Sequence, residues 1–351
     1  AATTKLQWKV DVDEAEIIFN KLEKKLKKTF AKYKWPTESD GVNEGQLDYL
    51  PYVQAKRPEE LVERYISDAP LAKLEIIKEA LEGVKWPSDE LRNLFYLGMT
   101  SSVLPVSNVR YGPGFGVIKP KLDPPVLTTF LKRTNRMISD LREPHVQKNR
   151  NVSSKVKLGD ARRMSEYMGE DSVDILITSP PYPGDHEYTK HSRLELMFMD
   201  LARTKEEFRL IKKRMLRGST TNIYKDDNEG DAVKSIKSIH KVVDEIDIRL
   251  KADGATSGFE KLYTKLIWEY FGGMYLVFVE AKKVLKSGGS FSLLVSDSHA
   301  FKMVHISTAD LLAEVAKLAG FKKHDIELWQ FKKSTSHKFK MYESILTVYK
   351  P

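Results

Sequence analysis

The first 150 residues place apolar side chains at helical spacing. Between residues 13 and 34, Ile18, Leu22, Leu26 and Phe30 recur every four positions and form one apolar stripe. Lysines fill much of the remaining surface of this segment, and we interpret them as a solvated basic face, with a DNA-binding helix as the alternative. The same spacing predicts further helices at residues 59–66, 68–83, 88–104 and 127–142, with a Gly-rich loop at residues 112–116.

From about residue 150 onward, short β-branched runs alternate with helical segments. Strands are expected at residues 155–158, 173–177, 290–295, 324–331 and 344–349, the last two of them antiparallel. Helices are expected at residues 161–168, 188–199, 204–218, 231–250, 257–285 and 308–319. This alternation predicts an α/β fold.

One strand ends in an unusual way. The apolar run Val173–Ile177 is expected to be a buried strand, and Thr178-Ser179-Pro180-Pro181-Tyr182 follows it directly. Proline has no N–H to donate and a fixed φ, so two prolines stop the strand and stiffen the loop after it. In open α/β sheets, ligands bind at the carboxyl ends of the strands, so this loop is the main candidate for a functional site.

The residue types in this loop suit chemistry on an exocyclic amine of a nucleobase, whose lone pair is delocalised into the ring. Ser179 Oγ and the Pro180 carbonyl can accept the two amino hydrogens and localise that lone pair for attack. Pro181 keeps these acceptors in place, and Tyr182 offers a ring on which an extruded base can stack. The alternative interpretation is a Pro-Pro turn without any chemistry.

This Thr-Ser-Pro-Pro-Tyr run resembles motif IV of the amino-group DNA methyltransferases, and looks most like the cytosine-N4 branch, because the adenine-N6 branch usually has Asp or Asn at the position of Ser179. The resemblance implies a class I methyltransferase (Rossmann-like) mixed sheet with helices on both faces, plus helical N-terminal and inserted segments. It implies transfer of a methyl group from S-adenosylmethionine to cytosine N4 in double-stranded DNA, by base flipping and direct in-line transfer. Asp185 is within reach as an acceptor for the leaving proton.

The resemblance also implies which residues bind the cofactor. Tyr52 and Lys56 lie in a Tyr-x-x-x-Lys-x-Pro segment similar to motif X, where the lysine meets the methionine carboxylate; an ordinary surface lysine fits the sequence equally well. Asp68, followed by Ala-Pro-Leu-Ala, looks like the acid after the second strand of the family. Asp160 resembles the adenine-side acid of motif III, or is a helix N-cap. Thr178 completes this set.

The expected domain organisation follows from these assignments. Residues 1–48 form an N-terminal helical extension, and residues 49–351 form the methyltransferase catalytic domain, with a linker and helix at residues 119–150. Residues 218–258 are an insertion, which serves either as a target-recognition segment or as a solvent-facing excursion.

Composition narrows the function. The chain has 351 residues, 41% hydrophobic, with a net charge of +9 that favours a polyanionic partner. It contains no cysteine, which excludes the thiolate mechanism of cytosine-C5 methyltransferases, thiolate zinc sites and disulfides. Its eight histidines show no convincing metal-ligand spacing. We find no apolar run of about 18 residues and no signal-peptide pattern, so a cytoplasmic protein is expected.

The resemblance breaks at one important point. The family's first strand ends in a Gly-rich turn beneath the cofactor, and no such turn occurs here. By order it belongs between Ile66 and Ala69, where roughly fifty residues of a βαβ unit are missing. Three explanations remain open: the sequence joins two pieces across an omitted stretch, a second chain supplies the motif, or cofactor binding is lost and DNA binding kept. The first is favoured, because loss of central strands exposes apolar faces of a sheet.

The functional alternatives also remain open. The amine could be adenine N6 or belong to an RNA base, and a cognate restriction endonuclease is an expected partner of a modification enzyme. The non-enzymatic alternative is a DNA-binding subunit that lacks its own cofactor-binding motif.

Overall fold

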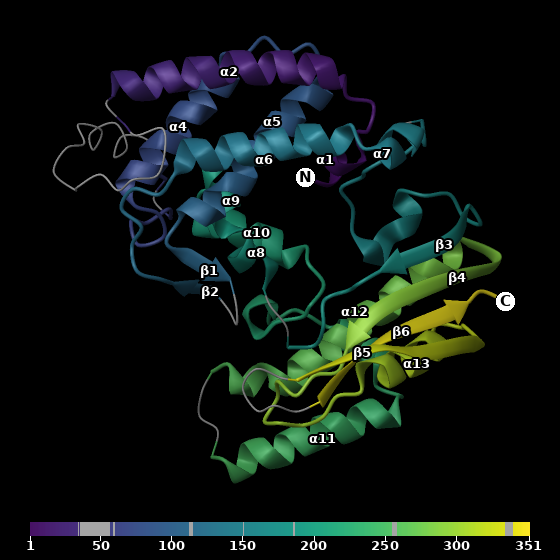
Figure 1. Ribbon diagram of the computed structural model, residues 1–351. Helices are drawn as coiled ribbons and strands as arrows, with labels where there is room; N and C mark the ends of the chain where they lie inside the picture. Colours follow the sequence, from purple (N-terminus) through teal and green to yellow (C-terminus); the bar gives the residue numbers. More distant parts are fainter. Residues whose placement is uncertain are drawn as a thin grey trace. The chain divides into compact units, whose positions relative to one another are not determined.

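The structure, a computed structural model, divides into two compact units that are interleaved along the chain (Figure 1). Unit 1 comprises Ala1–Val156 and Lys190–Phe208, and unit 2 comprises Lys157–Thr189 and Arg209–Pro351. The boundary expected at residue 48 lies outside the described residues. These are residues 1–33, 35, 57–58, 60–111, 115–149, 151–184, 187–254, 258–333 and 340–351.

Unit 1 is mainly helical. Its elements are α1 (Ala2–Leu6), α2 (Val12–Lys32), α4 (Asp68–Glu82), α5 (Asp89–Val106), β1 (Val109–Tyr111), β2 (Phe115–Val117), α6 (Val126–Leu141), α7 (Pro144–Asn149) and α9 (Arg193–Phe198). Two further helices, α8 (Tyr188–His191) and α10 (Lys205–Lys213), contain the points where the chain passes between units. Among the helices described above, none is long and apolar enough to cross a membrane.

Four of the five helices expected before residue 150 begin and end close to their predicted positions. In α2, Leu22, Leu26 and Phe30 are buried as predicted, whereas Phe19 is buried and Ile18 only half-buried. The N-cap of α4 is Ser67, and Asp68 is the first helical residue, as the expected start at residue 68 requires. The Gly-rich loop at residues 112–116 is shorter than expected, because its last two residues belong to β2 of a small hairpin.

Unit 2 is an α/β structure built on one mixed sheet, which confirms the expected α/β class. Its strands are β3 (Val173–Thr178), β4 (Leu285–Ser296), β5 (Lys323–Lys333) and β6 (Lys340–Tyr349), in the spatial order β3-β4-β6-β5. Strands β3 and β4 are parallel, and β6 is antiparallel to both of its neighbours. Its helices are η1 (Ala161–Glu166), η2 (Thr220–Asn222), η3 (Glu229–Val233), α11 (Lys237–Ala252), η4 (Glu260–Leu262), α12 (Tyr263–Val284) and α13 (Thr308–Leu318).

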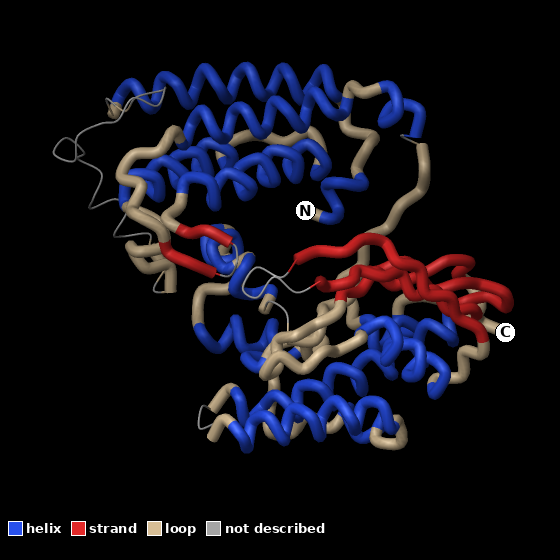
Figure 2. The backbone as a smooth tube through the Cα atoms, turned by 60° about the horizontal axis from the view of Figure 1, so that its bottom comes forward, coloured by secondary structure: helices blue, strands red, loops and turns tan. Residues whose placement is uncertain are grey.

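Helices α12 and α13 pack on the same face of this sheet. Alternate residues of β4, Phe291, Leu293 and Val295, are buried in one apolar cluster with both helices. The Phe278 ring on α12 packs edge-on against Phe291, at a centroid distance of 5.7 Å. Figure 2 shows the unit 2 helices on one side of the strands.

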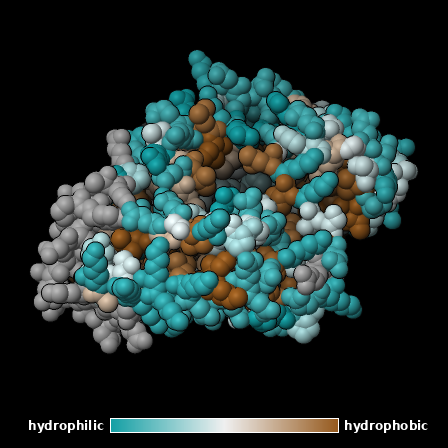
Figure 3. Space-filling model, turned by 90° about the horizontal axis from the view of Figure 1, so that it is seen from above, coloured by the Kyte–Doolittle hydropathy of each residue, from teal (hydrophilic) through white to brown (hydrophobic). Residues whose placement is uncertain are grey.

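The opposite face and the outer edge of β3 differ from the expectation. The Val173–Ile177 strand was expected to be buried, but Ile175 and Ile177 are 61% and 81% exposed, so this prediction was wrong. Ile175 and Ile177 project from the face opposite Leu176, which packs on the apolar cluster with α12 and α13, and β3 is one of the two edge strands of the sheet. Helices were also expected on both faces of the sheet. Within unit 2, the described helices cover only one of its two faces. In Figure 3, a space-filling view from above, apolar residues reach the surface at several places.

Three local predictions were wrong as well. Residues 60–66 form turns instead of a helix, and Arg57 donates to the carbonyl oxygens of Leu61 and Ile66, at 2.9 and 3.1 Å. Residues 155–158 are extended but not paired with a described strand, and Leu158 is exposed. The helix expected at residues 161–168 is the short 3₁₀ segment η1.

Because Ile177 is exposed, we expect its substitution to change the free energy of unfolding only slightly. The Ile177→Ala variant should lower the free energy of unfolding by less than about 1 kcal/mol, as for a surface substitution. The Leu293→Ala variant, in the neighbouring strand but fully buried, should cost about 2–5 kcal/mol. Urea denaturation followed by circular dichroism measures both. Equal losses would contradict the exposed position of Ile177.

Candidate functional site

The parallel pairing of β3 with β4 determines where the candidate site lies. Thr178, the last residue of β3, pairs with Leu293 of β4, and β4 ends three residues later at Ser296. Because parallel strands end at the same edge of a sheet, the segments that follow them emerge there together. These are the proline loop, defined here as residues 179–184, and the segment that begins at Asp297.

The proline loop presents polar groups beside a buried proline. Ser179 is exposed, and its Oγ lies 3.3 Å from the hydroxyl oxygen of Tyr182. Pro180 is buried, Pro181 is half-buried, and Tyr182 is half-buried with its side chain against the core of unit 2. The structure therefore brings all four predicted catalytic residues into one short loop, with Ser179 accessible from solvent.

Two glycines attach this loop to neighbouring segments. Gly184 donates its N–H to the carbonyl of Gly218 at 3.0 Å and has a φ of +80°, which favours glycine. A Cβ on Gly184 would lie 2.7 Å from Cβ of Ala300, so the loop contacts the segment after β4 at close range. A Cβ on Gly218 would lie 3.0 Å from Cβ of Pro181. The proline loop is therefore held from two sides.

The segment after β4 contributes a group of titratable side chains that the sequence analysis did not identify. His305 donates from Nε2 to the buried carboxylate of Asp297 at 2.9 Å. The His299 ring stacks on the His305 ring at a centroid distance of 4.7 Å. Burial, together with the neighbouring His305, lowers the pKa of His299. A polar Ser-Asp-Ser-His run directly after an apolar strand was the available sequence signal.

Asp160 is engaged by a single arginine. Its Oδ1 accepts from the backbone N–H of Arg162 at 2.9 Å, which confirms the N-cap interpretation. The Arg162 guanidinium also bridges Asp160 Oδ2 and Glu229 Oε1, at 2.7 Å each. Burial raises the pKa of Asp160, but the hydrogen bonds and charge of Arg162 outweigh this and lower that pKa overall. Its adenine-side role stays a prediction.

The remaining predicted cofactor residues do not gather around the proline loop within one unit. Thr178 is half-buried at the end of β3, in unit 2. Asp68 belongs to unit 1 and forms an ion pair with Arg57. Tyr52, Lys56 and Asp185 lie outside the described residues.

Where the Gly-rich turn was expected, the chain enters α4, and Leu71 N donates to Ser67 O at 3.2 Å in the first turn of that helix. The explanation by an omitted stretch stays a prediction. In the described part of the chain, no parallel strand precedes β3, and no Gly-rich turn follows one. Asp160 and Asp68 are already paired with arginines. Among the described residues, no group of three acidic or histidine side chains could hold a metal.

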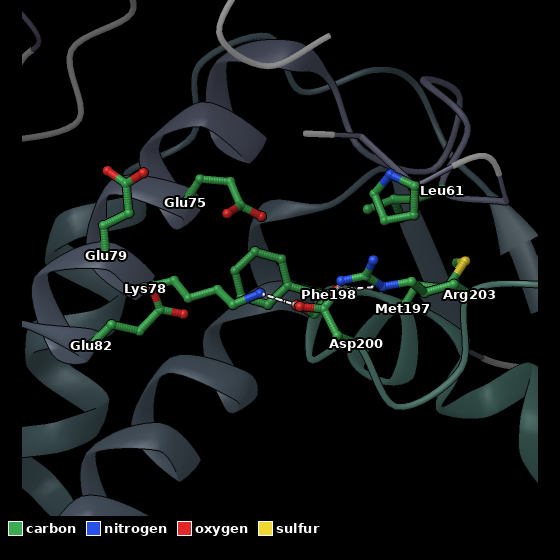
Figure 4. Close-up of a pocket in the computed structure, with 10 residues that line it drawn as sticks. Leu61, Glu75, Lys78, Glu79, Glu82, Met197, Phe198, Asp200 and Arg203 are labelled. Atoms are coloured by element: carbon green, nitrogen blue, oxygen red, sulfur yellow. Dashed lines mark hydrogen bonds and ion pairs between the residues drawn. The ribbon is translucent and has the colours of Figure 1, made fainter. Parts of the chain in front are cut away.

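Unit 1 contains a separate pocket of about 350 Å³ (Figure 4). Lys78 points across it and bonds Asp200 at 2.8 Å and the carbonyl of Phe198 at 3.2 Å. The lining has four carboxylates and two cations, which disfavours an anionic ligand, and it includes no predicted site residue. The lining residues are Pro58, Leu61, Glu75, Lys78, Glu79, Glu82, Met197, Phe198, Asp200 and Arg203.

The ion pair of Asp160 predicts a pH-dependent effect. Asp160→Asn keeps a capping side chain but removes the charge, so at pH 7 it should lower the free energy of unfolding by about 1 kcal/mol. Because the folded-state pKa of Asp160 lies below its unfolded value, this contribution is present above about pH 4 and is lost as the pH falls through the folded value. Urea denaturation between pH 7 and pH 3 measures the difference in free energy of unfolding between the wild type and Asp160→Asn, which should become smaller as the pH falls. The exposed Asp226→Asn serves as control, and a difference independent of pH would contradict the assignment.

A scan against models of protein families, a search of curated proteins and a search of solved structures find no match to this chain.

Proposed function

We propose that this chain carries the amine-binding part of an amino-group DNA methyltransferase that acts on cytosine N4. The observation that supports this most directly is the position of the proline loop. The Ser-Pro-Pro-Tyr sequence lies at the carboxyl end of β3, beside a parallel strand, with Ser179 exposed and the loop held on both sides.

The local geometry suits the proposed task. Ser179 Oγ and the Pro180 carbonyl accept the two hydrogens of the target amine, which draws its lone pair out of conjugation with the ring. Among the described residues, no hydrogen bond already occupies the Pro180 carbonyl, and the Ser179 hydroxyl has only the long contact to Tyr182. The exposed part of the Tyr182 ring stacks on the extruded base. The contacts of Gly184 and Gly218 keep these groups in place before the base arrives.

The order of elements supports the finer fold assignment, a class I methyltransferase. A long helix, a Leu-Lys-Ser-Gly-Gly run, a strand, a helix and two antiparallel strands are expected from the C-terminal half of such a sheet. Helix α12, the run at the start of β4, helix α13, and strands β5 and β6 follow in this order.

The family binds the methyl donor, S-adenosylmethionine, above a Gly-rich turn, and this sequence has no such turn between Ile66 and Ala69. We therefore propose that a second polypeptide contributes the cofactor-binding half. Strand β3 offers an outer edge, with Ile175 and Ile177 exposed, where further strands could continue the sheet. A DNA-binding subunit that does not take part in methylation is the second candidate, favoured by the same missing turn.

A complementation assay tests the proposal under conditions in which the proposed second polypeptide is also present. Extract from a strain of the source organism in which this gene is deleted supplies that polypeptide. Duplex DNA and labelled S-adenosylmethionine are then incubated with extract alone, purified chain alone, or both, and the digested nucleosides are identified by mass. We expect labelled N4-methylcytosine only with both components. Labelled N6-methyladenine would change the assigned base, and no added label would support the DNA-binding subunit.

The role of Ser179 is tested in the same assay. Ser179→Ala should slow methylation by roughly tenfold to a thousandfold, the scale of one lost oriented polar contact in an active site. The matched control is Ser287→Ala, in the same unit but at the amino end of β4, where its hydroxyl bonds Pro351 O at 3.0 Å. Undiminished N4 methylation by the Ser179 variant would refute the assigned role.

A further inference from the structure

Cations gather around one aromatic ring in unit 2. Arg217 Cζ, Lys213 Nζ and Arg209 Cζ lie 5.1, 5.6 and 6.0 Å from the centre of the Tyr224 ring. Arg214 follows Lys213 directly and is exposed. We call these five residues the Tyr224 cluster. Such contacts are favourable for each cation, and the ring holds them close to one another.

Only part of this positive charge is neutralised within the protein. Arg217 is buried and makes a bidentate ion pair with Asp227, at 2.8 and 2.9 Å. Arg209, Lys213 and Arg214 are exposed, and none of them forms an ion pair with a described carboxylate. Arg209 and Lys213 are also four residues apart in sequence, a spacing at which like charges on a helix destabilise it by a few tenths of a kcal/mol. An external anion would remove this repulsion.

The cluster is directly attached to the proline loop. Arg217 precedes Gly218, whose carbonyl accepts from Gly184 and whose Cα lies against Pro181. Lys212, beside Lys213, pairs with the buried carboxylate of Glu187, the first described residue after the loop, at 3.2 Å. The backbone segment that carries the exposed cations therefore contacts the proline loop through Gly218 and the residue after it through Lys212.

We propose that Arg209, Lys213 and Arg214 bind consecutive phosphates of duplex DNA and so orient it at the proline loop. This inference rests on the proposed function, because it identifies the surface by which the same site holds its substrate. Several exposed cations on a rigid support suit a repeating phosphate backbone better than a single small anion. The net charge of +9 agrees with a polyanionic partner.

Helix α2 provides a matched control surface. Lys21, Lys24 and Lys28 are exposed on this helix of unit 1. Changing these three lysines to Gln removes as much charge as changing Arg209, Lys213 and Arg214 to Gln. A comparison of the two triple variants therefore separates a local contact from the effect of net charge.

Fluorescence anisotropy of a labelled 30-base-pair duplex, titrated at 50–300 mM KCl, measures the contacts without any methyl transfer. Arg209→Gln/Lys213→Gln/Arg214→Gln should weaken binding roughly tenfold to a hundredfold near 0.15 M salt, and should reduce the slope of log K against log[salt] by about 2 to 3. The α2 triple variant should stay within about threefold of the wild type. Arg209→Lys/Arg214→Lys retains the charges and should retain the slope.

The outcomes distinguish this inference from the proposed function. Equal losses in both triple variants, or no loss in the Tyr224 cluster variant, would overturn the inference and leave the methylation proposal standing. Tighter, equally cluster-dependent binding of single-stranded RNA of the same length would assign the surface to RNA instead of duplex DNA. Cluster-dependent duplex binding without N4 methylation in the complementation assay would support this surface while removing the proposed reaction.

Discussion

The parallel hydrogen bonding of β3 to β4 is the constraint on which the candidate site depends. It places the ends of two strands at one edge of the sheet, although more than a hundred residues separate them in sequence. The proline loop and the segment after β4 meet there, and Gly184 allows them to approach within van der Waals contact. If this register shifted by one residue, Leu176 would leave the helix-covered face, Ile177 would take its place there, and Thr178 would no longer pair with Leu293.

The side chains that stabilise unit 2 and those of the candidate site belong to different strands of that pair. The apolar cluster under α12 and α13 fixes β4, and β3 is attached to the sheet through β4 alone among the described strands. The Arg162 bridge between Asp160 and Glu229 connects the start of unit 2 to the segment before α11. Ser179 can therefore be exposed without loss of the core, while Pro180 stays buried and Tyr182 packs against the core.

The sequence predicted the regular elements well where one local signal dominates. Helix α2 has its apolar stripe at Leu22, Leu26 and Phe30, and the Thr204–Glu207 capping box forms at the start of α10 with both of its hydrogen bonds. The proline loop also lies at a strand end, as expected. These features depend on residues within a few positions of each other, so periodicity and capping patterns suffice to find them.

Features that depend on distant partners were not predictable in this way. The apolar composition of Val173–Ile177 suggested a buried strand, but burial depends on which strands and helices lie beside it, and among the described strands β3 pairs with β4 alone. The Asp297–His305–His299 group was missed because its members meet only after the chain folds back beyond β4. Asp160 shows the intermediate case, since its capping bond is local and its charge partner Arg162 is shared with the distant Glu229.

The outer edge of β3 has a consequence for handling the isolated chain. Natural sheets usually protect such an edge with lysine, proline or a bulge, and the Val-Asp-Ile-Leu-Ile-Thr sequence of β3 contains neither lysine nor proline. Its one charge, Asp174, is paired with Lys286 at 2.8 Å, which weakens it as a source of repulsion. An edge of this kind can pair with a strand of another chain, so β3 is a segment through which copies of the isolated chain can associate when it is concentrated.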